Sequence, residues 1–177
     1  MAKLRPGRCH REVERAFTRH SRYRKKSYIK GIPGSRVAKY VMGSSKAQFA
    51  KRFILKSAEK EKSLIRHNAL ESARIAITNF MNKKVKPENY KFIIHTYPHQ
   101  VLREKPIACG AGADRYSSGM QKAFGKPVGR AAIIKSNQQV FSIEVDNAYF
   151  GFAVEALKRA GKKLPIRIAI DNGKPLC

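Results

Sequence analysis

The fold is decided by the stretch "GRAAIIKSNQQVFSIEVDNAYFGFAVEALKRAGKK", residues 129–163. Its first half holds two runs rich in β-branched and other apolar residues, at 129–136 and 139–146. Runs of this composition on either side of a short polar step are typical of paired strands. The pattern predicts a β-hairpin that turns at Asn137 and Gln138.

The second half of the same stretch has a helical period. Phe150, Val154 and Leu157 recur at three- and four-residue steps, which predicts the buried face of an α-helix. Asp146 is placed to cap the start of this helix, and Gly161 is placed to end it. Strands followed directly by a helix favour a sheet with helices packed on it.

The other elements extend this arrangement. A second helix is expected from about Asn68, as its cap, to Lys83, because apolar residues again recur at helical spacing: Leu70, Ala73, Ile77, Phe80 and Met81. Strands are expected within 47–59, 89–98 and 165–171. We therefore predict an α+β fold, with a mainly antiparallel sheet of four to five strands and two helices on one side of it.

The net charge identifies the kind of partner. The chain has 38 Lys and Arg against 12 Asp and Glu, a net charge of +26. This is far more than solubility requires and implies a polyanionic partner. No apolar run approaches the roughly 18 residues that span a bilayer, and no apolar signal segment opens the chain. We expect a cytoplasmic protein that binds nucleic acid, not a membrane protein.

The basic residues are concentrated at the N-terminus. Residues 1–30 contain eleven Lys or Arg and only two acids, with no sustained apolar stripe, so this segment cannot bury enough surface to fold alone. Aromatic residues are interleaved with its cations, a mixture typical of contacts with folded RNA. We predict a basic RNA-binding N-terminal extension at 1–49 and an α+β RNA-binding domain at 50–177. A Gly-rich loop is expected at about 105–130.

The loop sequence "GAGADRYSSGMQKAFGKPVGR", residues 110–130, resembles a phosphate-binding loop only superficially. A P-loop requires the pattern G-x-x-x-x-G-K-[ST]. Here five residues separate Gly119 from Gly125, and Pro127 stands where the hydroxyl residue is needed. Arg115 replaces the third glycine of a dinucleotide fingerprint. A long loop of glycines and spaced cations favours contact with successive phosphates of an RNA instead.

The cysteines and histidines form no metal site or catalytic pattern. Cys9, Cys109 and Cys177 are widely separated and form no CxxC pair. Beside Cys9, which we expect to be a buried thiol, His10 is expected to face RNA. His95 is expected to be a strand residue whose ring has a hydrogen-bond partner. We predict no metal, no cofactor and no catalytic residue.

Two alternatives share the charge of this chain. One is an RNA-modifying or RNA-processing enzyme whose basic arm recruits its substrate. The other is a free regulatory or chaperone-like RNA binder. An assay of RNA turnover with common cofactors separates the first alternative from a purely structural role.

Five segments occur in the order of one family: "RPGRCHR" (5–11), "KGIPGSRV" (30–37), "ALESARIA" (69–76), "GAGADR" (110–115) and "GMQKAFGKP" (119–127). In this order they resemble the large-subunit ribosomal protein family numbered sixteen in the universal naming, in its archaeal and eukaryotic form, ten-e. The segments are distributed over most of the chain, from residue 5 to residue 127. The absence of a longer tail after "IRIAIDNGKPLC" favours an archaeal-type ribosome in the cytoplasm.

The resemblance implies a structural role. It implies binding to large-subunit ribosomal RNA near the central protuberance and the aminoacyl-tRNA path, with the loop reaching toward the peptidyl-transferase region. The implied partners are this RNA, aminoacyl-tRNA and neighbouring ribosomal proteins, with no membrane and no DNA. The RNA-binding candidates are Arg5, Arg8, Arg11, Arg15, Arg22, Arg24, Lys25, Lys26, Lys30 and Arg36. The candidates in the loop near tRNA are Gly110, Gly112, Arg115, Gly119, Lys122, Lys126 and Arg130.

Overall fold

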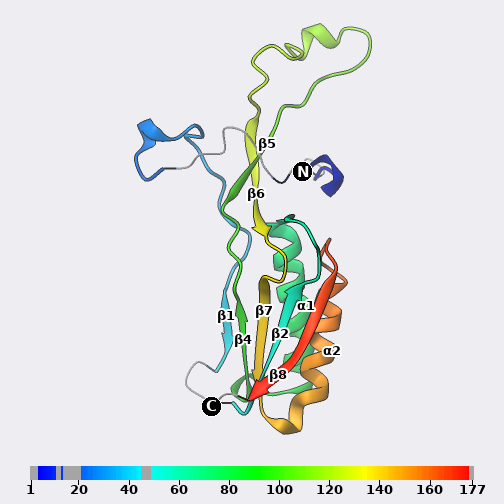
Figure 1. Cartoon of the computed structure of the whole chain (residues 1–177). Coiled ribbons are helices and arrows are strands. Elements are labelled where there is room, and N and C mark those ends of the chain that lie inside the picture. The colour runs from blue at the N-terminus through cyan, green and yellow to red at the C-terminus, as the bar shows by residue number, and fades with distance from the viewer. Residues whose placement is uncertain (1–3, 11–12, 14–20, 45–48, 176–177) are drawn as a thin grey trace.

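The computed structural model describes residues 4–10, 13, 21–44 and 49–175. Figure 1 shows an elongated arrangement. A sheet with two helices occupies one end. At the other end two paired strands, β5 (Gln100–Glu104) and β6 (Lys126–Ile134), carry a long loop away from the sheet, and we call this strand pair the ribbon. The described helices include none that is long and apolar enough to cross a membrane.

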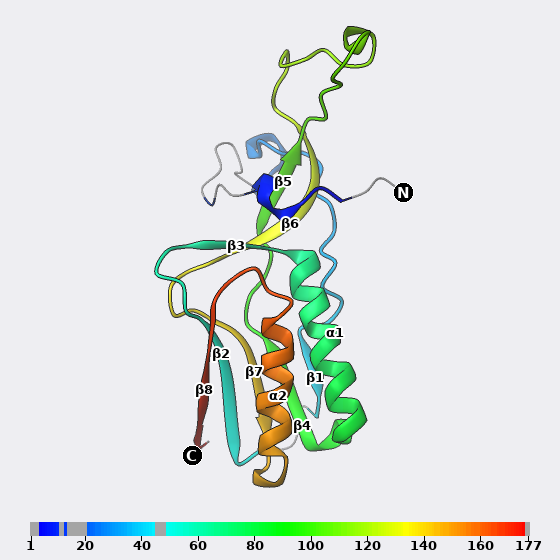
Figure 2. The same ribbon diagram turned by 90° about the vertical axis from the view of Figure 1, so that its right-hand side faces the viewer.

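The body is built on a five-stranded antiparallel sheet in the order β1-β4-β7-β2-β8. Its strands are β1 (Val41–Gly43), β2 (Lys51–Ser57), β4 (Tyr90–Ile94), β7 (Gln139–Val145) and β8 (Ile168–Pro175). Two helices, α1 (His67–Lys84) and α2 (Phe150–Gly161), lie side by side over one face of this sheet (Figure 2). The predicted α+β fold, with helices on one side of an antiparallel sheet, is confirmed.

The core lies between the sheet and the helices. Along β2, Phe53 and Leu55 are fully buried while Arg52 and Ile54 on the opposite face are half-buried, which is the alternation expected of a strand with one covered face. The predicted buried face of α1 is also confirmed: Leu70, Ala73, Ile77, Phe80 and Met81 are all buried. Burial of these apolar side chains is the main stabilising contribution to the body.

A second antiparallel sheet was not expected. It has the order β3-β6-β5, with β3 (Ser63–Arg66), β5 (Gln100–Glu104) and β6 (Lys126–Ile134). The predicted hairpin is therefore wrong, because β6 belongs to this sheet and β7 to the other. Both edges of β7 are already paired, with β2 and with β4. The chain still turns at Asn137, which has a φ of 56°, but the turn joins two sheets.

The starts of both helices also differ from the prediction. Arg66, not Asn68, is the N-cap of α1, and Asn68 lies in the first turn. Asp146 precedes a short 3-10 turn at Asn147–Tyr149 rather than α2 itself, and its side chain makes no cap hydrogen bond. Gly161 is the last residue of α2, as predicted.

The buried face of α2 is formed mainly by small residues. Ala153, Ala156, Leu157 and Ala160 are buried, whereas Phe150 is 42% exposed. Alanines bring α2 close to its neighbours. The predicted stripe is correct for Leu157, correct in part for Val154, which packs half-buried against the core, and wrong for Phe150. The Phe150 ring instead makes an edge contact with the Phe53 ring, with 5.3 Å between the two ring centres.

The predicted extension contributes a strand to the body. Within 1–49, β1 pairs with β4 at the edge of the five-stranded sheet. Val37 and Met42 are buried in the core. The last part of the extension is thus packed against the domain that follows it.

Candidate nucleic-acid interface

The Gly-rich loop runs from residue 105 to 125, between the end of β5 and the start of β6. It projects away from the helices at the far end of the molecule (Figure 1). Two of the candidates assigned to it, Lys126 and Arg130, lie in β6. The loop is therefore shorter than the stretch expected from sequence, and it is carried on a strand pair.

Four glycines of the loop have a positive φ, a conformation that other residues rarely adopt, and three of the four lie in open space. Gly110, Gly112 and Gly119 have φ values of 115°, 74° and 56°. A Cβ atom at any of them would meet nothing within 4 Å, so the glycines serve the backbone path and not close packing within the chain. Gly112 precedes a short 3-10 turn, η4 (Ala113–Arg115), which shapes the tip.

Lys105 holds the two limbs of the loop together. Its ammonium group donates to the backbone oxygens of Gln121 and of Lys122, the latter at 3.2 Å, and lies 3.4 Å from Ser118 Oγ. Gly125 then passes so close to the backbone of Glu104 that a Cβ atom would lie 3.0 Å from the Glu104 carbonyl carbon. These contacts close the loop at its root and fix its path.

The side chains of the closed loop point largely to solvent. Arg115 and Lys122 are exposed, and so is Lys126 at the start of β6. Tyr116 is 87% exposed and Met120 is 70% exposed. Exposed rings and thioethers beside cations can stack on or fill gaps between bases, while the cations contact phosphates.

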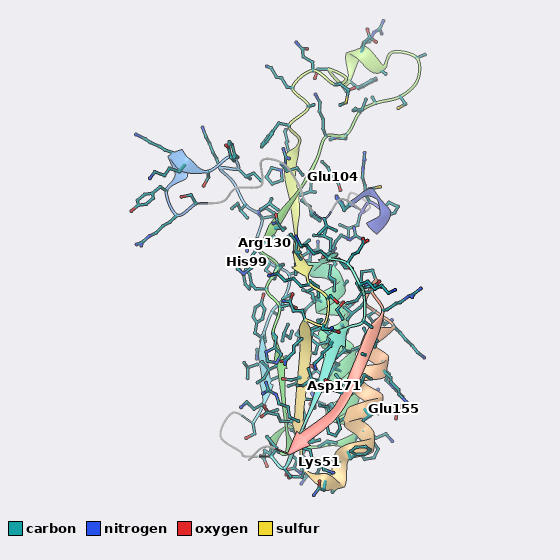
Figure 3. The ribbon with its side chains drawn as sticks, in the orientation of Figure 1. Lys51, His99, Glu104, Arg130, Glu155 and Asp171 are labelled. Atoms are coloured by element: carbon teal, nitrogen blue, oxygen red, sulfur yellow. The ribbon has the colours of Figure 1, made fainter. Side chains whose placement is uncertain are left out.

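Arg130 makes contacts within the protein. Its Nε donates to the Pro33 carbonyl at 2.7 Å, and its Nη1 donates to the Tyr97 hydroxyl at 3.0 Å. Figure 3 places Arg130 close to His99, below the root of the loop. Because two of its donors are directed to protein oxygens, Arg130 braces the extension against the strand ribbon.

The N-terminal segment docks at the root of the loop. A short 3-10 turn, η1 (Gly7–His10), brings His10 Nε2 to 2.9 Å from Glu104 Oε1. Arg5 Nε lies 3.7 Å from the other oxygen of the same carboxylate, and Arg66 Nη1 donates to the Arg5 carbonyl at 2.8 Å. Figure 3 shows Glu104 at this junction, where the ribbon passes the N-terminal turn.

The roles expected of Cys9 and His10 are reversed. Cys9 is exposed, whereas His10 is only 6% exposed. The reason is the Glu104 carboxylate, which draws the imidazole inward and leaves the thiol on the outside of the 3-10 turn. His10 therefore anchors the segment and does not face outward.

The remaining cations of the extension form a basic hook at residues 21–30, which projects to the side of the ribbon (Figure 1). Ser27 Oγ closes the hook by donating to the Ser21 carbonyl at 3.0 Å and accepting from its amide at 2.9 Å. Ile29 is buried beneath it. The exposed candidates here are Arg22, Lys25, Lys26, Lys30 and, just beyond the hook, Arg36.

Of four other candidates of the extension, two are placed only by the turn in which they lie and two lie outside the described residues. Arg8 lies in η1 and Arg24 lies in a second 3-10 turn, η2 (Arg24–Lys26). Arg11 and Arg15 lie outside the described residues.

His67 is a residue of this region that sequence reasoning missed. It is buried at the start of α1, and its Nδ1 accepts a hydrogen bond from the Arg36 amide at 3.3 Å. Burial, together with the positive charges of Arg36, Arg130 and Arg66, lowers the pKa of the imidazole below its usual range. Neutral His67 is the form that can accept this hydrogen bond. The tripeptide Arg66-His67-Asn68 has no local signal that predicts a buried histidine at this position.

The histidine expected on a strand lies just after one. The His95 ring lies 2.7 Å from Ser142 Oγ, so the predicted satisfied ring is confirmed. Within the described residues, no group of three or more His, Cys, Asp or Glu side chains gathers in a way that could hold a metal ion.

Taken together, an α+β body carries two basic projections, the loop and the extension, which meet at Glu104. A net charge of +26, with six cations and no acid in residues 21–36 of the extension, defines a protein of the nucleic-acid-binding class. The five-stranded sheet and helices support these projections.

Similarity to known proteins identifies the family. A family model described as Ribosomal protein L16p/L10e matches residues 18–171. The large ribosomal subunit protein uL16 of Methanococcus maripaludis strain S2 is 44% identical over 175 residues, which cover 98% of this chain and 97% of the relative. The protein of the same name from Archaeoglobus fulgidus is 42% identical over 173 residues, which cover 97% and 95%. The chain belongs to the L16p/L10e family of ribosomal proteins.

Family membership confirms several predictions at once. The resemblance drawn from the five sequence segments is correct, and the chain is a structural ribosomal protein of the large subunit and not an enzyme. The relatives are archaeal, in agreement with the predicted archaeal-type ribosome in the cytoplasm.

Proposed function

We propose that the chain binds the large-subunit ribosomal RNA near the base of the central protuberance, beside the path of aminoacyl-tRNA. In this proposal the loop at 105–125 reaches toward the peptidyl-transferase region and helps to position tRNA. The extension passes between RNA helices. The partners are this RNA, aminoacyl-tRNA and neighbouring ribosomal proteins.

One observation supports the proposal most strongly. The loop is closed by Lys105, and the N-terminal segment is docked on the adjacent Glu104. A closed loop presents its cations in a fixed arrangement, so less conformational entropy is lost when it meets a structured RNA. The docked segment brings further cations to the same end of the molecule.

The proposal divides the loop candidates into two roles. Arg115, Lys122 and Lys126 are exposed and act as phosphate contacts. Gly110, Gly112 and Gly119 let the backbone follow its path. Arg130 acts as a brace that orients the extension, because its guanidinium already binds Pro33 and Tyr97.

The extension candidates act through charge. Phosphate contacts made by Arg and Lys fix the position of a protein on RNA, and they make binding steeply dependent on salt. In this role we place Arg5, Arg8, Arg11, Arg15, Arg22, Arg24, Lys25, Lys26, Lys30 and Arg36.

The loop assignment is tested by the double substitution Arg115→Ala and Lys122→Ala. Neither side chain is buried, so folding and entry into the large subunit should be unchanged, whereas accommodation of aminoacyl-tRNA should slow by about tenfold if two phosphate contacts are lost. The matched control is Lys135→Ala, which removes an exposed cation from the turn after β6. Accommodation at the normal rate by particles that contain the double variant would refute the loop role.

A further inference from the structure

The two helices form a groove on the face of the body that points away from the sheet. The floor of this groove is made by Ala76 and Phe80 of α1, and its rim carries Lys83, Lys162 and Lys163. Its volume is about 340 Å³. The Arg159 guanidinium lies 4.1 Å from the centre of the Phe80 ring and closes one side. We call this the helix groove; none of the RNA-contact candidates lines it.

A second hollow continues the helix groove toward the N-terminal turn. It shares Lys162 and Lys163 with the helix groove, adds Arg66, and has a volume of about 380 Å³. Leu64 and Leu164 contribute apolar surface to it. Of the described residues that line the two hollows, none is acidic. The combined surface is therefore a groove with an apolar floor at Ala76 and Phe80 and a positive rim.

The neighbouring face of α1 presents a row of uncharged side chains, unlike the cationic projections that we assign to RNA. Ser72, Ile75, Asn79 and Asn82 follow one another at helical spacing, and all four are exposed. None of the four is charged, although the chain as a whole carries a net charge of +26. Ile75 is 42% exposed. An uncharged face with an exposed Ile favours contact with protein, because nucleic-acid interfaces are strongly cationic.

We propose that the helix groove binds an acidic, amphipathic segment of another protein in the same particle. An apolar side chain of the segment packs over Ala76 and Phe80, and its carboxylates pair with Lys83, Lys162 and Lys163. A phosphate backbone satisfies the lysines but leaves the apolar floor uncovered, so a protein segment complements the groove better than RNA does. The inference rests on the membership of the chain in the large subunit.

Site-directed photo-cross-linking tests the proposal. Cys9, Cys109 and Cys177 are first replaced by serine, and then Asn79→Cys is labelled with a benzophenone maleimide and the chain is assembled into large subunits. The expected product after illumination is sensitive to protease, resistant to ribonuclease, and maps by mass spectrometry to an acidic segment of a second protein. The parallel probe, Met120→Cys in the loop, should cross-link to RNA.

The outcomes separate this inference from the proposed function. A cross-link from Asn79→Cys to RNA, or no cross-link while Met120→Cys still labels RNA, overturns the helix-groove proposal alone. Failure of both labelled chains to sediment with large subunits contradicts both proposals.

Charge substitutions distinguish specific docking from mere proximity. Since one exposed ion pair contributes at most about fivefold to binding, Lys162→Ala combined with Lys163→Ala should reduce the protein cross-link by roughly threefold to tenfold. The matched variant Lys162→Arg with Lys163→Arg should retain it. An unchanged yield in the alanine variant, with normal sedimentation, would refute the charge pairing.

Discussion

The Glu104→Ala substitution should undock the N-terminal segment from the root of the loop. Glu104 is the shared partner of His10, at 2.9 Å, and of Arg5, at 3.7 Å. The His10 side chain is 4% exposed and that of Glu104 is 21% exposed, so solvent screens their contact only partly. The Arg5 side chain is 48% exposed, and its pairing with Glu104 contributes much less.

The expected magnitude follows from these contacts. Removal of one partner of a largely buried hydrogen bond costs about 1–3 kcal/mol, and the exposed Arg5 pair adds at most about 1 kcal/mol. Since each 1.4 kcal/mol changes an equilibrium tenfold, the undocked population should rise by roughly fivefold to several hundredfold. Glu104→Gln retains a hydrogen-bonding side chain and should have a much smaller effect.

Amide hydrogen exchange measured by NMR follows this undocking directly. The Cys9 amide donates to the Pro6 carbonyl at 3.2 Å in the docked turn, so its exchange should accelerate in Glu104→Ala while exchange at Ile77 inside α1 stays unchanged. Glu155→Ala is the matched control, because it removes an exposed carboxylate that pairs with Arg159 on α2. Unchanged exchange at Cys9, or equal acceleration at Cys9 and Ile77, would refute the local anchor.

Three further predictions concern stability and RNA binding. The pKa of His67 is lowered in the folded state, so the contribution of its neutral form to stability should be complete above about pH 6.5. Below that pH the free energy of unfolding should decrease, by at most about 1.4 kcal/mol per pH unit. Chemical denaturation of His67→Gln should show a flatter dependence of stability on pH. Gly43→Ala should lower the free energy of unfolding by about 2–4 kcal/mol, because φ is 84° at this residue and a Cβ atom would clash with the Tyr90 carbonyl. The control Gly31→Ala, where a Cβ atom meets nothing within 4 Å, should change the free energy of unfolding by less than about 0.5 kcal/mol. A similar loss in both variants would contradict this reasoning. Arg115→Ala should reduce the slope of log affinity against log salt for ribosomal RNA by about 0.7–0.9. Arg130→Ala should chiefly lower thermal stability, because Arg130 binds Pro33 and Tyr97. The opposite result would reverse the roles assigned to these two arginines.

Local patterns predicted the elements of this fold better than their pairing. The buried face of α1 was predictable because Leu70, Ile77 and their neighbours repeat at the period of a single helix. The pairing of β6 was not, because it depends on whether the edges of β7 are free, and those edges are taken by β2 and β4 from distant parts of the chain. Sequence proximity favours a hairpin only when no other strand competes for the same edge.

The candidate site, too, was predictable in its local features but not in its contacts between distant residues. Composition identifies the cations but does not say which of them the protein itself uses. Arg130 and Arg115 are equivalent in the sequence, yet one binds Pro33 and Tyr97 while the other is exposed. The His10–Glu104 contact joins residues 94 positions apart, so no local spacing signals it.

The few acids of the chain explain how a protein of such high charge folds at all. Several acids of the described body pair with neighbouring cations: Glu71 with Arg74, Asp171 with Lys56, and Glu144 with both Arg52 and Lys91. These pairs reduce charge repulsion where the chain is compact. By contrast, residues 21–36 contain no acid and residues 105–125 contain only Asp114. In residues 21–36 no acid offsets the six cations, so a polyanion relieves the repulsion there and leaves the packing of the sheet and helices unchanged.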